Sequence, residues 1–246
     1  MPTAPGTAAA AAAEGRSPPQ SFSHMGSVCS SRSSAPVEAS PTTKMPSLKL
    51  VYFDGKGRGE PIRWILAAGG QAFEQEKFGF EEWPAKKPTT PYGSVPLLEV
   101  NGKPLCQTLA IARYAGTIGG LVSTDPFKNA LGDEAADTMA ELCSTFFSTM
   151  FEKDAEKKAA DEKKLFEETM PKIFGLWESR MSTKFFTDDK PIWQDVFLGH
   201  WLSRFAEINP QLIAKYPKLT ALKDAVLQID GVKKYLANPP TYSIPL

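Results

Sequence analysis

The chain has 246 residues, enough to bury a substantial core in one large domain or two small ones. Its formal net charge is zero, so no long-range field favours nucleic acid or an anionic membrane. Three widely spaced cysteines (Cys29, Cys106 and Cys143) argue against a disulfide scaffold or a zinc site and for a reducing compartment. The histidines are His24 and His200, so a Ser-His or Cys-His nucleophile pair in the folded part would depend on His200 alone.

Residues 1–46 are rich in Ala, Ser, Pro and Thr and nearly lack large apolar side chains. Such a segment cannot bury enough surface to offset its ordering entropy, so we expect a disordered N-terminal extension. Two alternatives stay open: the composition also resembles an organellar transit peptide, and translation from Met25 would create a myristoylation pattern with Cys29 available for a second lipid. Without those signals, and with no apolar run near the ~20 residues that span a bilayer, the sequence predicts a cytoplasmic protein.

The folded part begins near Ser47 with alternating strand and helix patterns. Strands are predicted over residues 48–53, 73–80, 96–100 and 103–105. Helices are predicted over residues 59–68, 81–87 and 108–115. The Asn101-Gly102 pair is a strong signal for a two-residue hairpin turn between the last two strands.

From Pro126 onward the sequence contains long amphipathic stretches and no convincing strand. These stretches predict helices over residues 126–153, 159–181, 192–206 and 217–228. The order β-α-β-(α)-β-β-α followed by helices predicts an α/β thioredoxin-like domain with a mixed four-stranded sheet over residues 47–119. A linker of about residues 118–125 then leads to an all-α domain over residues 126–246.

The segment 48–60, LKLVYFDGKGRGE, places a tyrosine at the carboxyl tip of a strand, beside a helix that opens at about Arg58. Ligands of open α/β sheets gather at this position, and unpaired backbone N–H groups favour an anion there. The phenol of Tyr52 cannot act as a base at neutral pH, but it can donate a strong hydrogen bond to an anion such as a thiolate. For Tyr52 taken alone, simple packing under a loop is the favoured explanation.

Six short motifs, in a fixed order and spacing, resemble the cytosolic glutathione transferases. They are Tyr52-Phe53, GRGEPIR at 57–63, EWP at 82–84, PYGSVP at 91–96, LEVNG at 98–102 and QTLAIARY at 107–114. They most resemble the sigma class, which includes glutathione-dependent prostaglandin D synthases and the lens crystallins of cephalopods. The resemblance covers residues from 48 onward and is dense over about the first eighty of them.

The resemblance implies that Tyr52 hydrogen-bonds the sulfur of glutathione and stabilises its thiolate, which is the species that attacks an electrophile. A free thiol has a pKa of ~8.5, and each unit of depression corresponds to about 1.4 kcal/mol of preferential binding of the anion. Arg58 matches an active-site arginine whose charge would further favour the thiolate. By itself Arg58 is equally a solvated residue at a helix start.

The same resemblance assigns the remaining contacts to glutathione. Val95 would pair with the cysteinyl backbone from a loop in which Pro96 follows a cis peptide bond. Gln107 and Thr108 would receive the γ-glutamyl carboxylate at a helix N-terminus. Without the family, Val95-Pro96 is a plain strand entrance and Thr108 is a helix cap.

Trp83 and Lys87 would meet the glycyl end of glutathione, with Lys87 supplying charge for its carboxylate. Lys86 is an equally basic neighbour, and the sequence does not choose between the two lysines. Glu141 matches an acidic residue that contacts the γ-glutamyl amine across a homodimer interface, although in isolation it is most simply a surface acid.

The electrophile pocket is expected between Phe53, Gly55 and the inward face of helix 126–153, including Cys143 and Phe147. Core packing explains these apolar residues equally well. Cys106 is not at the nucleophile position of the cysteine-type relatives, and Tyr52 stands where they have Cys, so thiol-disulfide transfer is disfavoured.

One position departs from the family pattern. The helical domains usually carry Ser or Thr three residues before a buried Asp, as a capping box, whereas here Ile192 precedes Asp195. An isoleucine side chain cannot accept the backbone N–H, so we expect a cap weakened by about 0.5–2 kcal/mol unless another group substitutes.

The resemblance therefore implies a homodimeric glutathione S-transferase of sigma type. It would use glutathione as co-substrate, require no metal, and add the thiolate to hydrophobic electrophiles. A prostaglandin-type isomerase that uses the same thiolate on an endoperoxide is one alternative. A non-catalytic ligand-binding or structural protein, like the lens crystallins, is the other.

Overall fold

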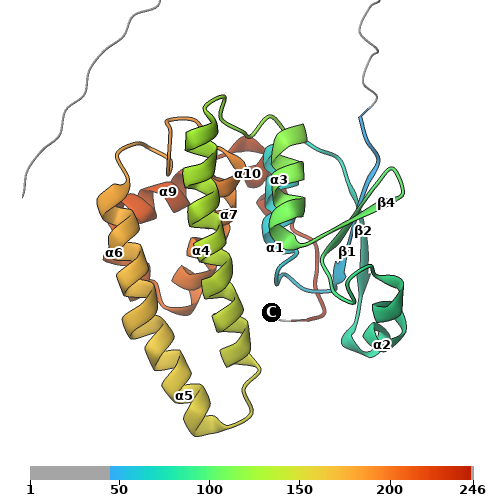
Figure 1. Ribbon diagram of the computed structural model, residues 1–246, viewed down its shortest axis with the longest axis horizontal. Helices are drawn as coiled ribbons and strands as arrows, with labels where there is room; N and C mark the ends of the chain where they lie inside the picture. Colours follow the sequence, from blue (N-terminus) through green and yellow to red (C-terminus); the bar gives the residue numbers. More distant parts are fainter. Residues whose placement is uncertain (1–44, 245–246) are drawn as a thin grey trace, which may run out of the picture. The chain divides into compact units, whose positions relative to one another are not determined.

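The computed structural model describes residues 45–244, so the predicted disordered extension and its two alternatives lie outside the described residues. The chain first forms a mixed four-stranded sheet in the order β2-β1-β3-β4 (Figure 1). The central strand β1 is parallel to β2 and antiparallel to β3, and β4 pairs with β3 as the second arm of a hairpin. The strands are β1 (Leu48–Phe53), β2 (Glu74–Phe78), β3 (Leu97–Val100) and β4 (Lys103–Cys106).

Strand β1 is buried on both faces. Leu48 and Leu50 belong to the large core that continues into the helices, whereas Val51 packs with Phe78 and Leu97 in a smaller cluster. Alternate side chains of a strand point to opposite faces, so the two clusters lie on opposite sides of the sheet. Helices α1 (Glu60–Ala68) and α3 (Thr108–Ile118) cover the first side, and the short α2 (Trp83–Lys86) lies on the other, flanked by 3₁₀ turns at Phe80–Glu82 and Lys87–Thr89 (Figure 1).

The residues after Asp125 form the helical part of the structure. Its helices are α4 (Pro126–Met150), α5 (Ala155–Lys163), a π-helical turn (Lys164–Thr169), α6 (Met170–Arg180), α7 (Trp193–Ile208), α8 (Pro210–Ala214), α9 (Pro217–Leu227) and α10 (Asp230–Ala237). Helix α7 is the most deeply buried of these and packs against α1, α4 and α9. One continuous apolar core runs from Leu48 in the sheet to Val232 in α10, so the sheet and the helices share their interior.

The predicted fold class, a thioredoxin-like α/β part followed by helices, is confirmed by this architecture. Several boundaries differ. The single helix predicted over residues 159–181 is α5 and α6 joined by the π-helical turn. Helices α8 and α10 were not predicted, because five and eight residues are too short to show a clear apolar period. Within residues 45–244, no helix is both long and apolar enough to cross a membrane.

The carboxylate of Asp195 organises the start of α7 from a fully buried position. It accepts the backbone N–H of Ile192 at 2.9 Å and that of Phe186 at 2.8 Å. Half of the capping box is therefore present. The missing half is replaced by the backbone, because the N–H of Asp195 donates to the Ile192 carbonyl oxygen at 3.0 Å. The backbone carbonyl oxygen of Ile192 therefore takes the place of the Ser or Thr hydroxyl that the usual capping box would supply.

Replacing Asp195 with Ala should lower the free energy of unfolding by roughly 2–5 kcal/mol, because two buried N–H groups lose their acceptor. Asp125 is the matched control, since its exposed carboxylate caps α4 by accepting from Phe127 at 2.8 Å. Asp125→Ala should cost about 1 kcal/mol. Urea denaturation of both variants measures the difference, and an Asp195→Ala variant no less stable than Asp125→Ala would contradict this account of the cap.

Candidate active site

The strand register brings three predicted site residues to one end of the sheet. Val51 pairs with Leu97, and Leu97 pairs with Cys106. The adjoining residue of each strand, Tyr52, Pro96 or Gln107, therefore lies at the same end. This end is also the carboxyl end of β1, where the chain turns toward α1. It is the position at which open α/β sheets bind ligands.

The Tyr52 hydroxyl is held by the turn that follows β1. Its oxygen accepts the backbone N–H of Arg58 at 2.8 Å, and the residue is only 8 % exposed. Burial raises the pKa of Tyr52, and this outweighs the opposite effects of the Arg58 N–H and of the charges on Arg58 and Arg63. The phenol therefore keeps its proton at neutral pH. Because its oxygen already accepts one bond, the O–H can be donated to a ligand.

The glycines of this turn make room for the tyrosine ring. Gly57 has a φ of +36°, and a Cβ placed there would lie 2.6 Å from the Tyr52 hydroxyl oxygen. A side chain at this position would push the ring away from the Arg58 N–H. The glycine-studded sequence between β1 and α1 is thus required by close approach as well as by backbone conformation.

Arg58 joins the turn to the helical part of the protein. Its Nη2 donates to the Ser144 hydroxyl of α4 at 3.1 Å, and its guanidinium carbon lies 5.5 Å from the centroid of the Phe147 ring. The positive charge is therefore held between Tyr52 and α4. Ser144 was missed by the sequence analysis, because nothing in a helical serine marks it as the partner of a distant arginine.

The loop before β3 and the start of α3 carry two unusual backbone conformations. The Val95–Pro96 peptide bond is cis, as the resemblance implied. Gln107 has a φ of +75°, which is uncommon for a residue with a side chain and often marks a functional site. Gln107 is also the N-cap of α3 and makes no side-chain capping bond, while Thr108 is the first helical residue and not the cap. The N-terminus of α3 is thus suited to a carboxylate.

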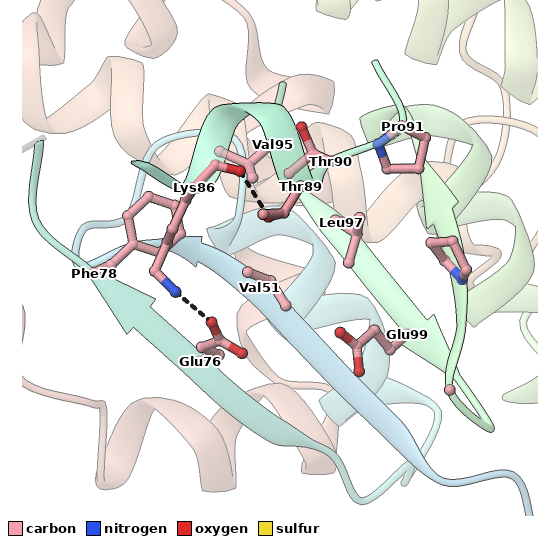
Figure 2. Close-up of a pocket in the computed structure, with 12 residues that line it drawn as sticks. Val51, Glu76, Phe78, Lys86, Thr89, Thr90, Pro91, Val95, Leu97 and Glu99 are labelled. Carbon is pink, nitrogen blue, oxygen red and sulfur yellow. Dashed lines mark hydrogen bonds and ion pairs between the residues drawn. The ribbon is translucent and has the colours of Figure 1, made fainter. Parts of the chain in front are cut away.

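The two adjacent lysines of the α2 region differ in their contacts. The Lys86 ammonium pairs with Glu76 of β2 at 2.6 Å and lies 5.1 Å from the centroid of the Phe78 ring (Figure 2). Lys87 is exposed, and within residues 45–244 its ammonium has no ion pair. Trp83 packs beside Phe53 and Phe78, with its ring 5.4 Å from that of Phe53. Of the two lysines, Lys87 is the one whose charge is free for a ligand.

The residues predicted for the electrophile pocket divide into two groups. Phe147 and Gly57 line a small hollow, with a cavity volume of about 20 Å³, between the β1–α1 turn, α4 and α7. The other three predicted residues are not among those that line this hollow. Cys143 is buried in the core, where burial raises the pKa of its thiol well above the ordinary range. Phe53 packs against Phe80 and Trp83, and Gly55 bridges to Ile244.

Glu141 and His200, which the sequence analysis also considered, lie in different environments. Glu141 is exposed on α4, in a shallow depression that it shares with Leu109 of α3 and Asp137. His200 is buried with its ring 5.0 Å from both Trp64 and Trp201. Burial lowers the pKa of His200 to about 3, so it is a neutral packed ring at physiological pH.

Both the sheet-containing part and the helical part of the chain match known domain families. Residues 47–117 match the model of the glutathione S-transferase N-terminal domain, and residues 140–239 match that of the C-terminal domain. A probable glutathione S-transferase 6 of Caenorhabditis elegans is 32% identical over 208 residues, which is 80% of this chain and 99% of the relative. The chain therefore belongs to the glutathione S-transferase family.

Other relatives come from more than one branch of that family. The hematopoietic prostaglandin D synthase of Gallus gallus is 30% identical over 201 residues, covering 81% of this chain and 100% of the relative. The solved prostaglandin synthase D of Nilaparvata lugens has a TM-score of 0.75 and 34% identity, covering 79% of this chain and 99% of that chain. A Nu-class transferase structure from Haemonchus contortus has a TM-score of 0.71 and 29% identity, covering 81% and 100%.

Replacing Gly57 with Ala should abolish most of the glutathione-conjugating activity, because the new methyl group would displace the Tyr52 hydroxyl. Gly70 is the matched control: its φ is +65°, but a Cβ there would meet nothing within 4 Å. The left-handed conformation should cost each variant about 1 kcal/mol of stability, and the contact with Tyr52 should add to this cost in Gly57→Ala. Measuring turnover together with thermal unfolding separates the loss of activity from the loss of stability. Equal activity in the two variants would contradict the view that Gly57 makes room for the Tyr52 hydroxyl.

Proposed function

We propose that this chain is a sigma-type glutathione S-transferase that holds glutathione as its thiolate with Tyr52 and adds it to hydrophobic electrophiles. The observation that carries the proposal is the buried, protonated Tyr52 hydroxyl, fixed by the Arg58 N–H at the sheet end that also presents Val95–Pro96 and Gln107. The matches to both transferase domains and the named relatives support the same activity.

In this mechanism Tyr52 acts as a donor and keeps its own proton. Glutathione loses the thiol proton to solvent, and the Tyr52 O–H and the Arg58 charge stabilise the sulfur anion. The thiolate then forms a carbon–sulfur bond to the electrophile. With a chlorinated aromatic substrate, the electron pair of the broken carbon–chlorine bond leaves with chloride. No covalent enzyme intermediate is required, so proximity and anion stabilisation supply the rate.

The rest of the glutathione molecule would be bound by backbone and charge. Val95 would pair with the cysteinyl backbone as an added strand. Gln107 and the free N–H groups at the start of α3 would receive the γ-glutamyl carboxylate. At the opposite end, Trp83 would contact the glycyl residue, and Lys87 would supply its carboxylate with a counter-charge.

The electrophile would enter on the α4 side of the sulfur. Arg58 and Phe147 meet there, and the hollow beside Gly57 continues with Phe146 and Met150. This assignment retains Phe147 from the sequence prediction and replaces Phe53, Gly55 and Cys143 by residues that line the hollow.

A prostaglandin-type isomerase is the second candidate function. The specific observation in its favour is the similarity to proteins named prostaglandin D synthases, in both sequence and solved structure. The same Tyr52-stabilised thiolate would act on an endoperoxide, and only the pocket beside α4 would distinguish the two activities. A crystallin-like role without catalysis is less well supported, because Tyr52 and its donor are in place.

A homodimer completes the proposal. Glu141 is exposed on α4, in a depression that it shares with Leu109 at the start of α3. In the homodimer that the resemblance implies, its proposed contact with the γ-glutamyl amine would be made in the partner subunit.

Tyr52→Phe should lower turnover of a general chlorinated aromatic substrate by roughly 10- to 100-fold, the value of one hydrogen bond to a charged group. The affinity for glutathione, measured by calorimetry, should stay nearly unchanged because the tripeptide keeps its other contacts. Equal turnover in the two proteins would remove Tyr52 from the mechanism.

Lys87→Ala should weaken glutathione binding by roughly two- to fivefold, the usual value of an exposed ion pair. Lys86→Ala is the matched control, because its ammonium is already paired with Glu76 (Figure 2). Calorimetric titration of both variants compares the two positions. A larger loss in Lys86→Ala would reverse the assignment of the glycyl carboxylate.

A further inference from the structure

The last described residues of the chain return to the end of the sheet that carries Tyr52. We call Thr241–Ile244 the C-terminal strap. After α10 the strap runs past α1 toward the carboxyl end of β1 (Figure 1). The N–H of Ile244 donates to the carbonyl oxygen of Asp54 at 2.9 Å, and the N–H of Ser243 donates to the Asp54 carboxylate at 3.1 Å. The strap thus pairs with the first residues of the turn that holds Tyr52.

Lys77 of β2 binds both the strap and Asp54. Its ammonium donates to the Thr241 carbonyl oxygen at 2.8 Å and pairs with the Asp54 carboxylate at 2.7 Å. The bond with the Lys77 ammonium, together with the Ser243 N–H, lowers the pKa of Asp54 to about 2. Asp54 is therefore an anion throughout the physiological range, and it accepts bonds from both the strap and β2.

The side chain of Tyr242 reaches a buried ion pair in α1. Glu60 and Arg63 are 3 % and 1 % exposed, and their charged groups are 3.0 Å apart. Tyr242 donates to one carboxylate oxygen of Glu60 at 2.7 Å, and Tyr235 of α10 donates to the other at 3.0 Å. A buried pair is favourable only when further hydrogen bonds satisfy the remaining polar atoms, and two of those bonds come from the last 12 residues of the chain.

Arg63 contacts both Tyr242 of the strap and the turn that follows β1. Its Nη1 donates to the Gly55 carbonyl oxygen at 3.0 Å, and its Nε donates to Gln75 at 2.8 Å. The guanidinium carbon lies 4.9 Å from the centroid of the Tyr242 ring and 5.9 Å from that of Tyr52. The arginine is therefore placed between the strap and the proposed catalytic tyrosine.

We propose that the C-terminal strap, and Tyr242 in particular, is a positioning element of the active site. By fixing Asp54 and Gly55 directly and Arg63 through Glu60, it would hold the turn 54–59 so that the Arg58 N–H meets the Tyr52 hydroxyl. This inference rests on the proposed role of Tyr52. Tyr242 itself makes no contact with glutathione in this account.

The composition of the turn explains why such support is needed. Residues 55–59 are Gly, Lys, Gly, Arg and Gly, so the turn has no apolar side chain with which to anchor itself in the core. Helix α1 is fixed independently by the fully buried Ile62, Ile65 and Leu66. Loss of the strap should therefore loosen the turn more than the helix, and affect catalysis more than stability.

The test compares Tyr242→Phe with Tyr216→Phe. The control removes an equivalent hydroxyl, which donates to the Pro171 carbonyl oxygen at 3.0 Å in the helical part. Tyr242→Phe should lower kcat by about three- to tenfold, with the KM for glutathione changed less than about twofold, and should move the acid limb of the kcat/KM profile to higher pH. Tyr216→Phe should leave both unchanged. Unaltered kcat and pH profile in Tyr242→Phe, or equal losses in both variants, would overturn the proposal.

A double-mutant cycle shows whether Tyr242 acts through Tyr52. In a Tyr52→Phe background, Tyr242→Phe should cause little further loss of kcat, whereas the same fold loss in both backgrounds would overturn the proposal. A fully active Tyr52→Phe variant would instead contradict the proposed function, so the two failures are distinct. Should Tyr242→Phe fold poorly, Lys77→Gln provides the second variant. It frees the strap from β2 and should change kcat in the same direction, and an unchanged kcat there would again overturn the proposal.

Discussion

The hydrogen bond from the Arg58 backbone N–H to the Tyr52 hydroxyl is the constraint on which the rest of the site depends. It fixes the tyrosine oxygen as an acceptor from one side, so that its proton is available to a ligand on the other. Burial keeps that proton in place at neutral pH. A backbone donor is well suited to this task, because it cannot rotate away or titrate. Its position depends entirely on the path of the turn.

Three parts of the chain that are distant in sequence define that path. Gly57 and Gly59 allow the turn to approach the tyrosine ring. The Arg58 side chain reaches across to Ser144 of α4, and the strap pairs with Asp54 and Gly55. Because the sheet and the helices share one core, the helical part can hold the turn rigidly from two directions. The proposed glutathione-binding end of the sheet is thus supported by residues outside the thioredoxin-like fold.

Much of the site could be predicted because its signals are local. The end of β1, the Val95-Pro96 loop and the Gln107-Thr108 helix start are each contiguous motifs, and strand register alone brings them together. Strand alternation places Phe53 with Val51, on the face that packs against Phe78 and Trp83. The bridge between Gly55 and Ile244 could not be predicted, because it joins segments far apart in the sequence. The choice of Lys87 over Lys86 depended on where Glu76 lies. The strap joins residues almost two hundred positions apart, and its only sequence signal was a charged pair, Glu60 and Arg63, within an apolar helix.

The central claim is that the protein keeps the sulfur of bound glutathione ionised at neutral pH. Ultraviolet titration of the thiolate absorbance in the complex tests it most directly. The account predicts a thiol pKa at least about one unit below the value of ~8.5 for a free thiol, which is a preference of about 1.4 kcal/mol for the anion. A bound thiol that ionises at the same pH as glutathione in buffer would contradict it.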